Sequence, residues 1–465
     1  MTIVYNAPRP TAEALRGMCG GAVHLPGDPG YDASRMPWNV WVSWLNPAAV
    51  AYPRTAAEVS ELVVVARKLG LQITTQATGH NASPLGDLSE VVLIKTSAMT
   101  SVEIDPVEGI ARVGAGTLWL DVVEAAAEHG VTVLHGSSPD VGVLGYSLGG
   151  GMGWYARELG LQTNALTGAT IVTADGSIVH ASATENADLF WAIRGGGGNY
   201  GVVTEVEFRT FRFTDAYAGM LVWPWEQAEA VLRVWATWAV DAPSSVTTSF
   251  RILQIPPMPE IPEPVRGRNL VVIDGAVLAT DAAAAAILTP LRALNPEMDT
   301  FARVPTAGLV RLHMDPEGPT PAVSATSILT ELPAAGIDAL LAVTGPGSES
   351  KLTVMELRQL GGALAVPAES AGAVSHIPGQ FVAFALSIAA TPELGEVGQR
   401  QCHEAIGALA PWANGRDYLN FAEATTDTSL GYDADAWLRL RQVKTDWDPF
   451  ALFIGNHAIP PLGDE

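Results

Sequence analysis

The stretch HGSSPDVGVLGYSLGGGMGW, from His135 to Trp154, decides how the rest of the chain is interpreted. Within it, Gly145-Tyr146-Ser147-Leu148-Gly149 matches the G-x-S-x-G pattern, in which a serine on a sharp strand-to-helix turn attacks an ester. The same stretch is rich in glycine, so its backbone can also approach a bound group closely. The question is whether Ser147 is a nucleophile or part of a binding loop.

The order of residues along the chain gives the hydrolase interpretation some support. Ser147 is followed by an acid, Asp448, and by a histidine, His457, which is the order found in α/β-hydrolases. Against it, no convincing oxyanion loop lies upstream of Ser147, and the other glycine-rich loops would have no role. A serine hydrolase using Ser147 therefore stays only as a distant alternative.

Composition excludes several classes of function. The chain has 465 residues, which favours two domains, and its 48% hydrophobic and 16% charged content is typical of a well-buried soluble protein. Its 49 acidic and 26 basic residues give a net charge of −23, which disfavours binding to nucleic acid or to anionic membranes. Two distant cysteines, Cys19 and Cys402, make neither a disulfide scaffold nor a four-thiolate metal site, and we expect no metal.

The N-terminal residues lack a basic start followed by an apolar run, so we expect no signal peptide. No apolar stretch reaches the about 18 residues needed to span a bilayer. We therefore expect a cytoplasmic protein, either a monomer or a homodimer, without a membrane partner.

The pattern of elements predicts an α+β fold. Residues 55–70 have helical spacing with a glycine stop, and a hairpin is expected around Asp175-Gly176. Strands are expected at 244–255, 269–279, 353–362 and 380–390, with helices at 281–294 and 393–412. We expect a first domain over residues 1–211, a second over 212–412 with an antiparallel sheet half covered by helices, and a segment, 413–465, that returns to the first.

Two further glycine-rich loops lie in the first domain. TTQATGHNASPLG, residues 74–86, and RGGGGNYG, residues 194–201, expose successive backbone N–H groups that can bind a pyrophosphate. A dinucleotide fingerprint is not present, because Trp119 stands where the third glycine after Gly114 and Gly116 should be. A P-loop is excluded because the chain has no GK[ST] triplet.

Taken together, these loops resemble a known family. TGHN at 78–81, residues 142–154, residues 186–208, and the C-terminal YLNF (418–421) and WDPFALF (447–453) are similar to the berberine bridge enzyme group of the vanillyl-alcohol-oxidase superfamily. The 6-hydroxy-D-nicotine oxidases and carbohydrate oxidases belong to this group, and the resemblance covers nearly the whole chain. It implies a two-part FAD-binding domain and a substrate-binding domain with a helix-covered antiparallel sheet.

The resemblance implies FAD attached covalently through His80. Many members add a second link through a cysteine, but Ser138 stands at that position here, so we expect a single link. Gln76 replaces the usual arginine of the loop before His80. Val141 matches a position where a small valine goes with access of oxygen to the flavin.

The resemblance also implies a wider set of cofactor-binding residues. They are Ala77, Thr78, Gly79, Asn81, Gly142, Gly145, Tyr146, Gly149, Gly150, Gly153, Gly201, Val203, Asn420 and Asn456.

In this family the catalytic base is often the first tyrosine of Y-x-N-Y, which here is Tyr418. A free tyrosine has a pKa near ~10, so a base at neutral pH needs a cationic or hydrogen-bonding neighbour, for which Arg358 and His376 are candidates. Alternation along residues 353–362 places Glu356 and Arg358 on the face toward the flavin and Met355 on the helix-covered face.

The sequence thus predicts an FAD-dependent oxidase that takes a hydride from an alcohol or amine carbon of a sugar or secondary metabolite. Molecular oxygen is the expected acceptor and hydrogen peroxide the product. A redox-neutral or oxidative-cyclising flavoenzyme of a tailoring pathway is the main alternative, and a flavin-binding scaffold without turnover is another.

Overall fold

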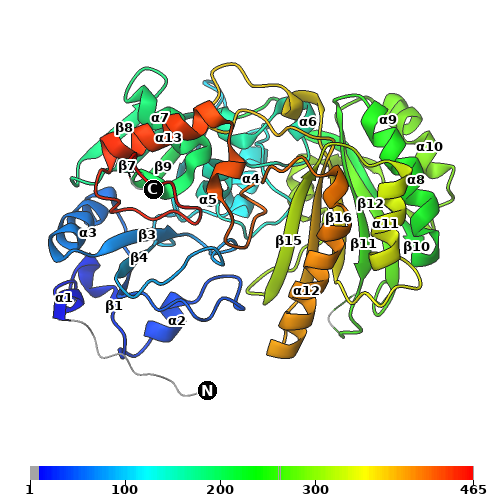
Figure 1. The fold of residues 1–465 in the computed structure, drawn as a ribbon. Coiled ribbons are helices and arrows are strands. Elements are labelled where there is room, and N and C mark those ends of the chain that lie inside the picture. Colours follow the sequence, from blue (N-terminus) through cyan, green and yellow to red (C-terminus); the bar gives the residue numbers. More distant parts are fainter. Residues whose placement is uncertain (1–9, 260, 262, 464–465) are drawn as a thin grey trace.

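A computed structural model describes residues 10–259, 261 and 263–463, and it contains three β-sheets (Figure 1). Two smaller sheets lie in the N-terminal part. The first has the order β1-β2-β4-β3, formed by Val23–His24, Ala49–Ala51, Val91–Lys95 and Gln72–Gln76. The second has the order β5-β6-β9-β7-β8, formed by Val102–Asp105, Ile110–Gly114, Val202–Arg209, Leu166–Val172 and Ile178–Ser182.

Local sequence signals explain the elements around these sheets. Helix α3 (Ala56–Leu69) begins after Thr55, whose hydroxyl accepts a bond from the Glu58 amide at 3.2 Å, and it ends at Gly70 with φ of 70°. Strands β7 and β8 form the hairpin expected around Asp175. The remaining helices of this part are α4 (Trp119–Glu128), α5 (Val143–Gly149), α6 (Ala156–Leu159) and α7 (Ala187–Gly196).

The third sheet has eight strands and is antiparallel throughout. Its order is β13-β10-β12-β11-β16-β17-β15, with β14 also paired to β10; the strands are Met298–Asp299, Asp215–Pro224, Asn269–Val277, Val246–Gln254, Val354–Gln359, Phe381–Ile388, Ala322–Leu329 and Ala302–Pro305. Residues 255–268 join the paired strands β11 and β12.

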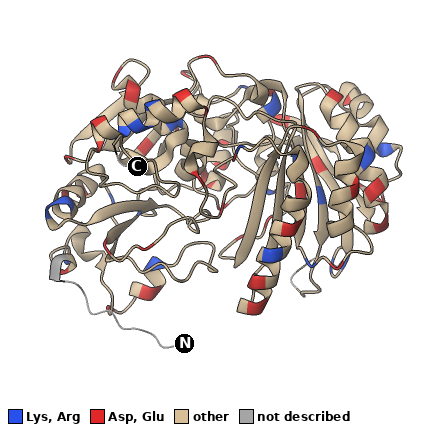
Figure 2. Ribbon diagram, in the orientation of Figure 1, with Lys and Arg blue, Asp and Glu red and all other residues tan. Residues whose placement is uncertain are grey.

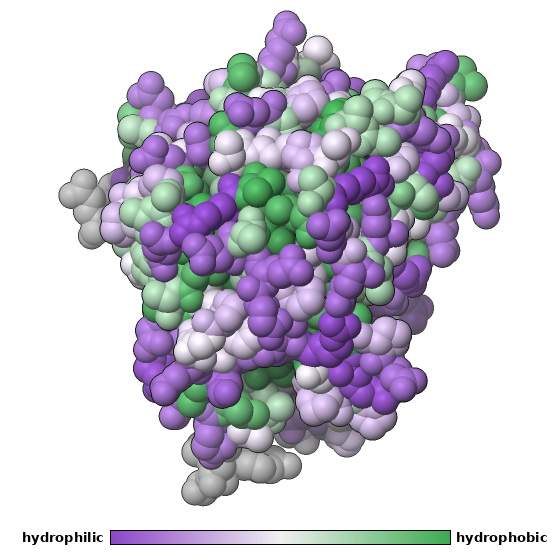
Figure 3. Space-filling model, turned by 90° about the vertical axis from the view of Figure 1, so that its right-hand side faces the viewer, coloured by the Kyte–Doolittle hydropathy of each residue, from purple (hydrophilic) through white to green (hydrophobic). Residues whose placement is uncertain are grey.

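Helices cover one face of this large sheet (Figure 1). They are α8 (Ala228–Asp241), α9 (Asp281–Ile287), α10 (Thr289–Arg292), α11 (Ala334–Thr344) and α12 (Pro392–Ala408). Met355 and Leu357 of β16 are buried in the core beneath them, on the face predicted from alternation. Figure 3, which views the molecule from this side, shows hydrophobic residues in small groups separated by hydrophilic ones.

The C-terminal segment packs against the N-terminal part. Helix α13 (Ala434–Trp447) contacts α7, and Ile73 of β3 exchanges backbone hydrogen bonds with Leu452 and Ile454, both at 2.8 Å. The buried Lys444–Asp448 ion pair, at 2.7 Å, anchors this return, since Asp448 also accepts the Leu452 and Phe453 amides. The segment thereby brings residues 454–457 beside the loop that follows β3.

Most charged residues lie on helices and loops (Figure 2), and acidic residues outnumber basic ones, 49 to 26. Among the helices that the structure describes, none combines the length and the hydrophobicity needed to cross a bilayer.

Candidate active site

One cavity of about 460 Å³ lies where the glycine-rich loops meet the uncovered face of the large sheet. Its walls come from four backbone segments, residues 75–81, 136–149, 195–199 and 454–457. Strands β11, β16 and β17 contribute side chains from the opposite side, among them Arg251, Glu356, Arg358 and Phe384. Segments far apart in the sequence thus converge on one space that is bounded by both parts of the molecule.

Most of the predicted site residues line this cavity. On the loop side they are Gln76, Ala77, Thr78, Gly79, His80, Asn81, Ser138, Val141, Gly142, Gly145, Tyr146, Gly149, Val203, Asn420 and Asn456. On the sheet side and its border they are Glu356, Arg358 and Tyr418.

Four predicted residues do not line it, and their surroundings explain why. A Cβ on Gly150 would meet the Tyr418 ring at 3.0 Å, one on Gly153 the His135 carbonyl at 2.0 Å, and one on Gly201 the Ile171 side chain at 2.7 Å. These glycines therefore serve close packing of the protein against itself.

His376 is the fourth, and it bonds its neighbour Ser375 at 2.9 Å, outside the cavity. It is therefore not positioned to lower the pKa of Tyr418.

Polar atoms on the loop side lack partners within the described protein. Asn81 Oδ1 and Tyr146 Oη are buried without a hydrogen bond. Buried polar groups are normally satisfied, so these atoms indicate a polar ligand in the cavity. Gly149 also lines the cavity, and its lack of a side chain lets Asn420 pack closely, since a Cβ there would lie 1.8 Å from Asn420 Oδ1. These residues fit the ring and phosphates of FAD.

A buried lysine lies directly behind Gln76, where the resemblance leads one to expect an arginine. Lys95 donates hydrogen bonds from Nζ to Gln76 Oε1 and to the Met36 carbonyl, and burial lowers its pKa to about 8. The sequence analysis missed this cation, because only the parallel pairing of β3 with β4 places Lys95 opposite Gln76.

Tyr418 lies where the loop side meets the sheet side. Burial raises its pKa to about 12, although the Asn420 amide, the backbone amides of Gly151 and Met152, and the Arg358 charge all act to lower it. Asn420 Nδ2 lies 3.4 Å from the phenol oxygen and also donates to the Tyr146 carbonyl at 2.9 Å. The phenol is therefore protonated at neutral pH, and donors surround its oxygen.

Glu356 and Arg358 form an ion pair of 2.7 Å on the cavity face of β16, and Arg358 lies 5.0 Å from the centre of the Phe421 ring. Burial acts to raise the pKa of Glu356, but the charges of Arg358 and His313 outweigh it and lower the pKa. Arg358 also lies 3.3 Å from Ser137 Oγ, so it bridges the sheet to the loop side.

His313 extends this pair into a buried network that the sequence analysis missed. Its Nε2 lies 3.4 Å from Glu356 Oε1, and its Nδ1 lies 2.8 Å from Asp274 Oδ2. Burial and Arg251 act to lower its pKa, but Asp274, Asp315 and Glu356 raise it to about 9. His313 thus links Asp274 to Glu356 behind the Glu356–Arg358 pair.

Glu423 is a second cavity residue without a signal in the sequence. Burial raises its pKa to about 7, against the hydrogen bond from Ser324 Oγ at 2.8 Å. Phe384 and Phe421, with ring centres 5.3 Å apart, also line the cavity. A carboxyl that titrates near neutral pH in such a place suits proton transfer.

The structure contradicts the hydrolase alternative. Ser147 lies inside helix α5, fully buried, and its hydroxyl has no described partner. Asp448 is engaged by Lys444, and His457 Nε2 lies 3.2 Å from the Leu419 carbonyl. A nucleophile elbow needs an exposed serine hydrogen-bonded to a histidine, so the G-x-S-x-G match is a coincidence of composition.

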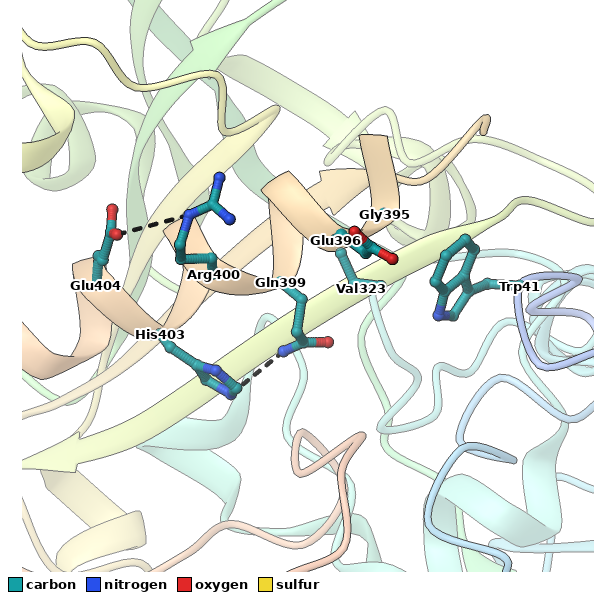
Figure 4. Close-up of a pocket in the computed structure, with 8 residues that line it drawn as sticks. All are labelled: Trp41, Val323, Gly395, Glu396, Gln399, Arg400, His403 and Glu404. Atoms are coloured by element: carbon teal, nitrogen blue, oxygen red, sulfur yellow. Dashed lines mark hydrogen bonds and ion pairs between the residues drawn. The ribbon is translucent and has the colours of Figure 1, made fainter. Parts of the chain in front are cut away.

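A second, shallow hollow lies apart from these residues (Figure 4). It lies between helix α12 and Trp41, and its volume is about 690 Å³. Its polar side chains bond one another, as in the Gln399–His403 contact of 3.2 Å. None of the predicted site residues line it.

Comparison with known proteins agrees with this geometry. Residues 47–182 match the model of a family described as FAD binding domain. The chain is 29% identical to (R)-6-hydroxynicotine oxidase of Paenarthrobacter nicotinovorans, over 95% of this chain and 97% of that protein. It is 36% identical to glucooligosaccharide oxidase of Sarocladium strictum, over 45% of this chain and 43% of that protein.

The chain is an FAD-binding oxidoreductase whose fold is shared with berberine bridge enzyme-like proteins. Its fold is that of BBE-like 1 of Physcomitrella patens, with a TM-score of 0.83 at 21% identity over 97% of this chain and 99% of that one. The fold is also similar to that of glucooligosaccharide oxidase of Acremonium strictum, with a TM-score of 0.79 at 24% identity over 97% of this chain and 99% of that one. The description of the latter structure names an FAD with cysteinyl and histidyl links.

Proposed function

We propose that this oxidoreductase is an oxidase that transfers a hydride from an alcohol or amine carbon of a sugar or secondary metabolite to FAD, and then passes the electrons to O₂, giving H₂O₂. The observation that carries the proposal is that His80 of the loop side and Tyr418, Glu356 and Arg358 line the same cavity. Its relatives include oxidases named for 6-hydroxynicotine and for glucooligosaccharide.

Bound FAD would supply the hydride acceptor, while the chain supplies positioning and proton transfer. Residues 75–81 and 136–149 would hold the cofactor, with Asn81 and Tyr146 offering unpaired polar atoms to it. Lys95 would contribute positive charge behind Gln76.

We propose one covalent link, through His80. Ser138 lines the cavity at the position where relatives with a second link carry a cysteine. Cys19 and Cys402 are buried outside the cavity, and burial raises the pKa of each to about 12, so neither thiol is a reactive thiolate.

Tyr418 is the proposed base, and its ionised form, the phenolate, takes the O–H or N–H proton of the substrate. The amides of Gly151 and Met152, together with Asn420, surround its oxygen and stabilise the negative charge that forms when it loses a proton. The Glu356–Arg358 pair places a fixed positive charge beside the ring of Phe421, which borders Tyr418 at 5.2 Å between ring centres.

The test is a substrate screen in air that measures peroxide. Sugars, oligosaccharides and cyclic amines are supplied to the purified protein, and flavin absorbance is followed anaerobically and then after oxygen is admitted. An oxidase bleaches with its substrate and regains its colour rapidly with release of H₂O₂. Bleaching followed by very slow return of colour in air contradicts the assignment of oxygen as acceptor, whereas turnover without peroxide favours the redox-neutral alternative.

A further inference from the structure

The carboxylate of Asp140 has an unusually complete set of polar neighbours next to His80. Its Oδ2 accepts hydrogen bonds from Trp38 Nε1 at 2.6 Å and from the Gly318 amide at 2.7 Å. Its Oδ1 accepts one from Ser138 Oγ at 2.9 Å and lies 3.5 Å from His80 Nε2. Burial acts to raise the pKa of Asp140, but the contacts with His80, Gly318 and Trp38 outweigh it, so the group is ionised.

The imidazole ring of His80 has a defined orientation in this setting. It stacks on the indole of Trp38 with ring centres 3.9 Å apart and planes 17° from parallel. Its Nδ1 lies 2.9 Å from Thr78 Oγ1. Trp38, which also donates to Asp140, thus ties the plane of the ring to the position of the carboxylate.

These contacts select one tautomer of the neutral imidazole. An ionised carboxylate can only accept, so the nitrogen that faces it is the one that carries the proton. Nε2 therefore carries the proton and Nδ1 keeps its lone pair, to which the Thr78 hydroxyl can donate. The nucleophilic nitrogen of His80 is then Nδ1.

We propose that Asp140 is a positioning residue for covalent attachment of FAD, acting by holding the His80 proton on Nε2 and leaving Nδ1 free to bond the flavin. This inference rests on the proposed histidyl link. His80 Nδ1 forms a bond to the 8α carbon of the flavin, and that carbon gives up one proton, while the electron pair of its broken C–H bond stays on the flavin ring.

The positive charge that forms on the imidazole lies beside the Asp140 carboxylate and is relieved when Nε2 gives up its proton. O₂, the acceptor in the proposed function, takes up the electron pair and the two protons as H₂O₂, so the balance closes.

The substitution Asp140→Asn tests this because it reverses the polarity toward His80 with little change of shape. The amide oxygen can keep the bonds from Trp38 and Gly318, which leaves the NH₂ group facing His80 Nε2. A donor at this place favours the tautomer with the proton on Nδ1, which cannot attack the flavin. Asp140→Glu keeps an ionised acceptor, and Glu317→Gln removes an exposed carboxylate beside Gly318 that does not line the cavity.

The variants and the wild type are purified and the fraction of flavin that stays with acid-precipitated protein is measured, together with intact mass, non-covalent FAD affinity and melting temperature. We expect Asp140→Asn to bind FAD but to attach it at least about tenfold more slowly, Asp140→Glu to retain more attachment than Asp140→Asn, and Glu317→Gln to resemble the wild type.

The inference is overturned if Asp140→Asn attaches FAD at the wild-type rate. It is also overturned if both Asp140 variants lose attachment equally while FAD affinity and melting temperature fall together, since that result assigns Asp140 only to loop structure. A wild-type protein that releases all its flavin in acid rejects the proposed histidyl link itself, which is a separate outcome.

Discussion

Glu423 gives the most quantitative prediction, because the pKa of its carboxyl differs between the unfolded and the folded protein. Burial raises the pKa of its carboxyl from 4.5 to about 7 in the folded protein. The folded state therefore favours the protonated carboxyl. The stability that this provides is fully present below about pH 4.5 and is lost as the pH rises through about 7.

The size of the effect follows from the shift. Each tenfold change in proton affinity is worth about 1.4 kcal/mol, and Glu423 keeps some contact with solvent, so the loss between about pH 5 and pH 8.5 is about 2–3 kcal/mol. Glu423→Gln mimics the protonated carboxyl and can still accept the bond from Ser324. We expect it to match the wild type near pH 5 and to exceed it by about 2–3 kcal/mol near pH 8.5.

The assay is urea unfolding followed by fluorescence of the 13 tryptophans at both pH values. Glu128→Gln, on the exposed surface of α4, is the matched control and should follow the wild type at each pH. Parallel loss of stability in Glu423→Gln and the wild type would refute the reasoning that burial of this carboxyl perturbs its pKa.

The other predictions concern the remaining cavity and its loops. Tyr418→Phe should lower kcat by about 10²–10⁴-fold without loss of flavin and should remove a rise of activity toward high pH, whereas a plateau above about pH 7 that persists in this variant would assign the base to Glu423. Ser147→Ala should leave flavin content and substrate oxidation unchanged. Loss of an esterase activity in this variant would show instead that Ser147 is a nucleophile. Gly149→Ala should displace Asn420, lower stability by about 1–3 kcal/mol in thermal unfolding and weaken FAD binding, and an unchanged protein would argue against the close approach. His313 has a pKa of about 9, above its ordinary 6.5, so its contribution to the free energy of unfolding is present below about pH 6.5 and is lost as the pH rises through about 9. His313→Gln should therefore lose less stability than the wild type over that pH range in urea unfolding.

Local signals in the sequence predict much of this architecture. The Thr55 cap and the glycine stop at Gly70 define α3, and alternation along β16 separates Glu356 and Arg358 from Met355. These features depend on a few adjacent residues, so they can be interpreted without the fold. The glycine-rich loops indicate where a cofactor lies for the same reason.

Other elements lack such a signal. Strand β10 (Asp215–Pro224) is a nearly continuous apolar run, and its period does not separate a strand from a buried helix. Helix α11 (Ala334–Thr344) is apolar nearly all round, so no polar face marks it. Tertiary packing, and not a sequence pattern, defines both elements.

Long-range pairs in the site are beyond pattern analysis altogether. His313 meets Asp274 across 39 residues, and Lys95 reaches Gln76 only because their strands pair. The glycine at 201 matches the family pattern, but its lack of a side chain serves packing against Ile171. The sequence identifies which residue types form the site. The fold determines which partners surround each residue and so set its ionisation.

The most direct test of the central claim is the fate of the flavin when the protein is denatured. Purified protein is precipitated with acid, and flavin absorbance and fluorescence are measured in the pellet and the supernatant for the wild type and for His80→Ala. The account predicts yellow, FAD-bearing wild-type pellets, one FAD per chain by intact mass, and a colourless His80→Ala pellet. Flavin released entirely into the wild-type supernatant, or retained by the His80→Ala pellet, would contradict it.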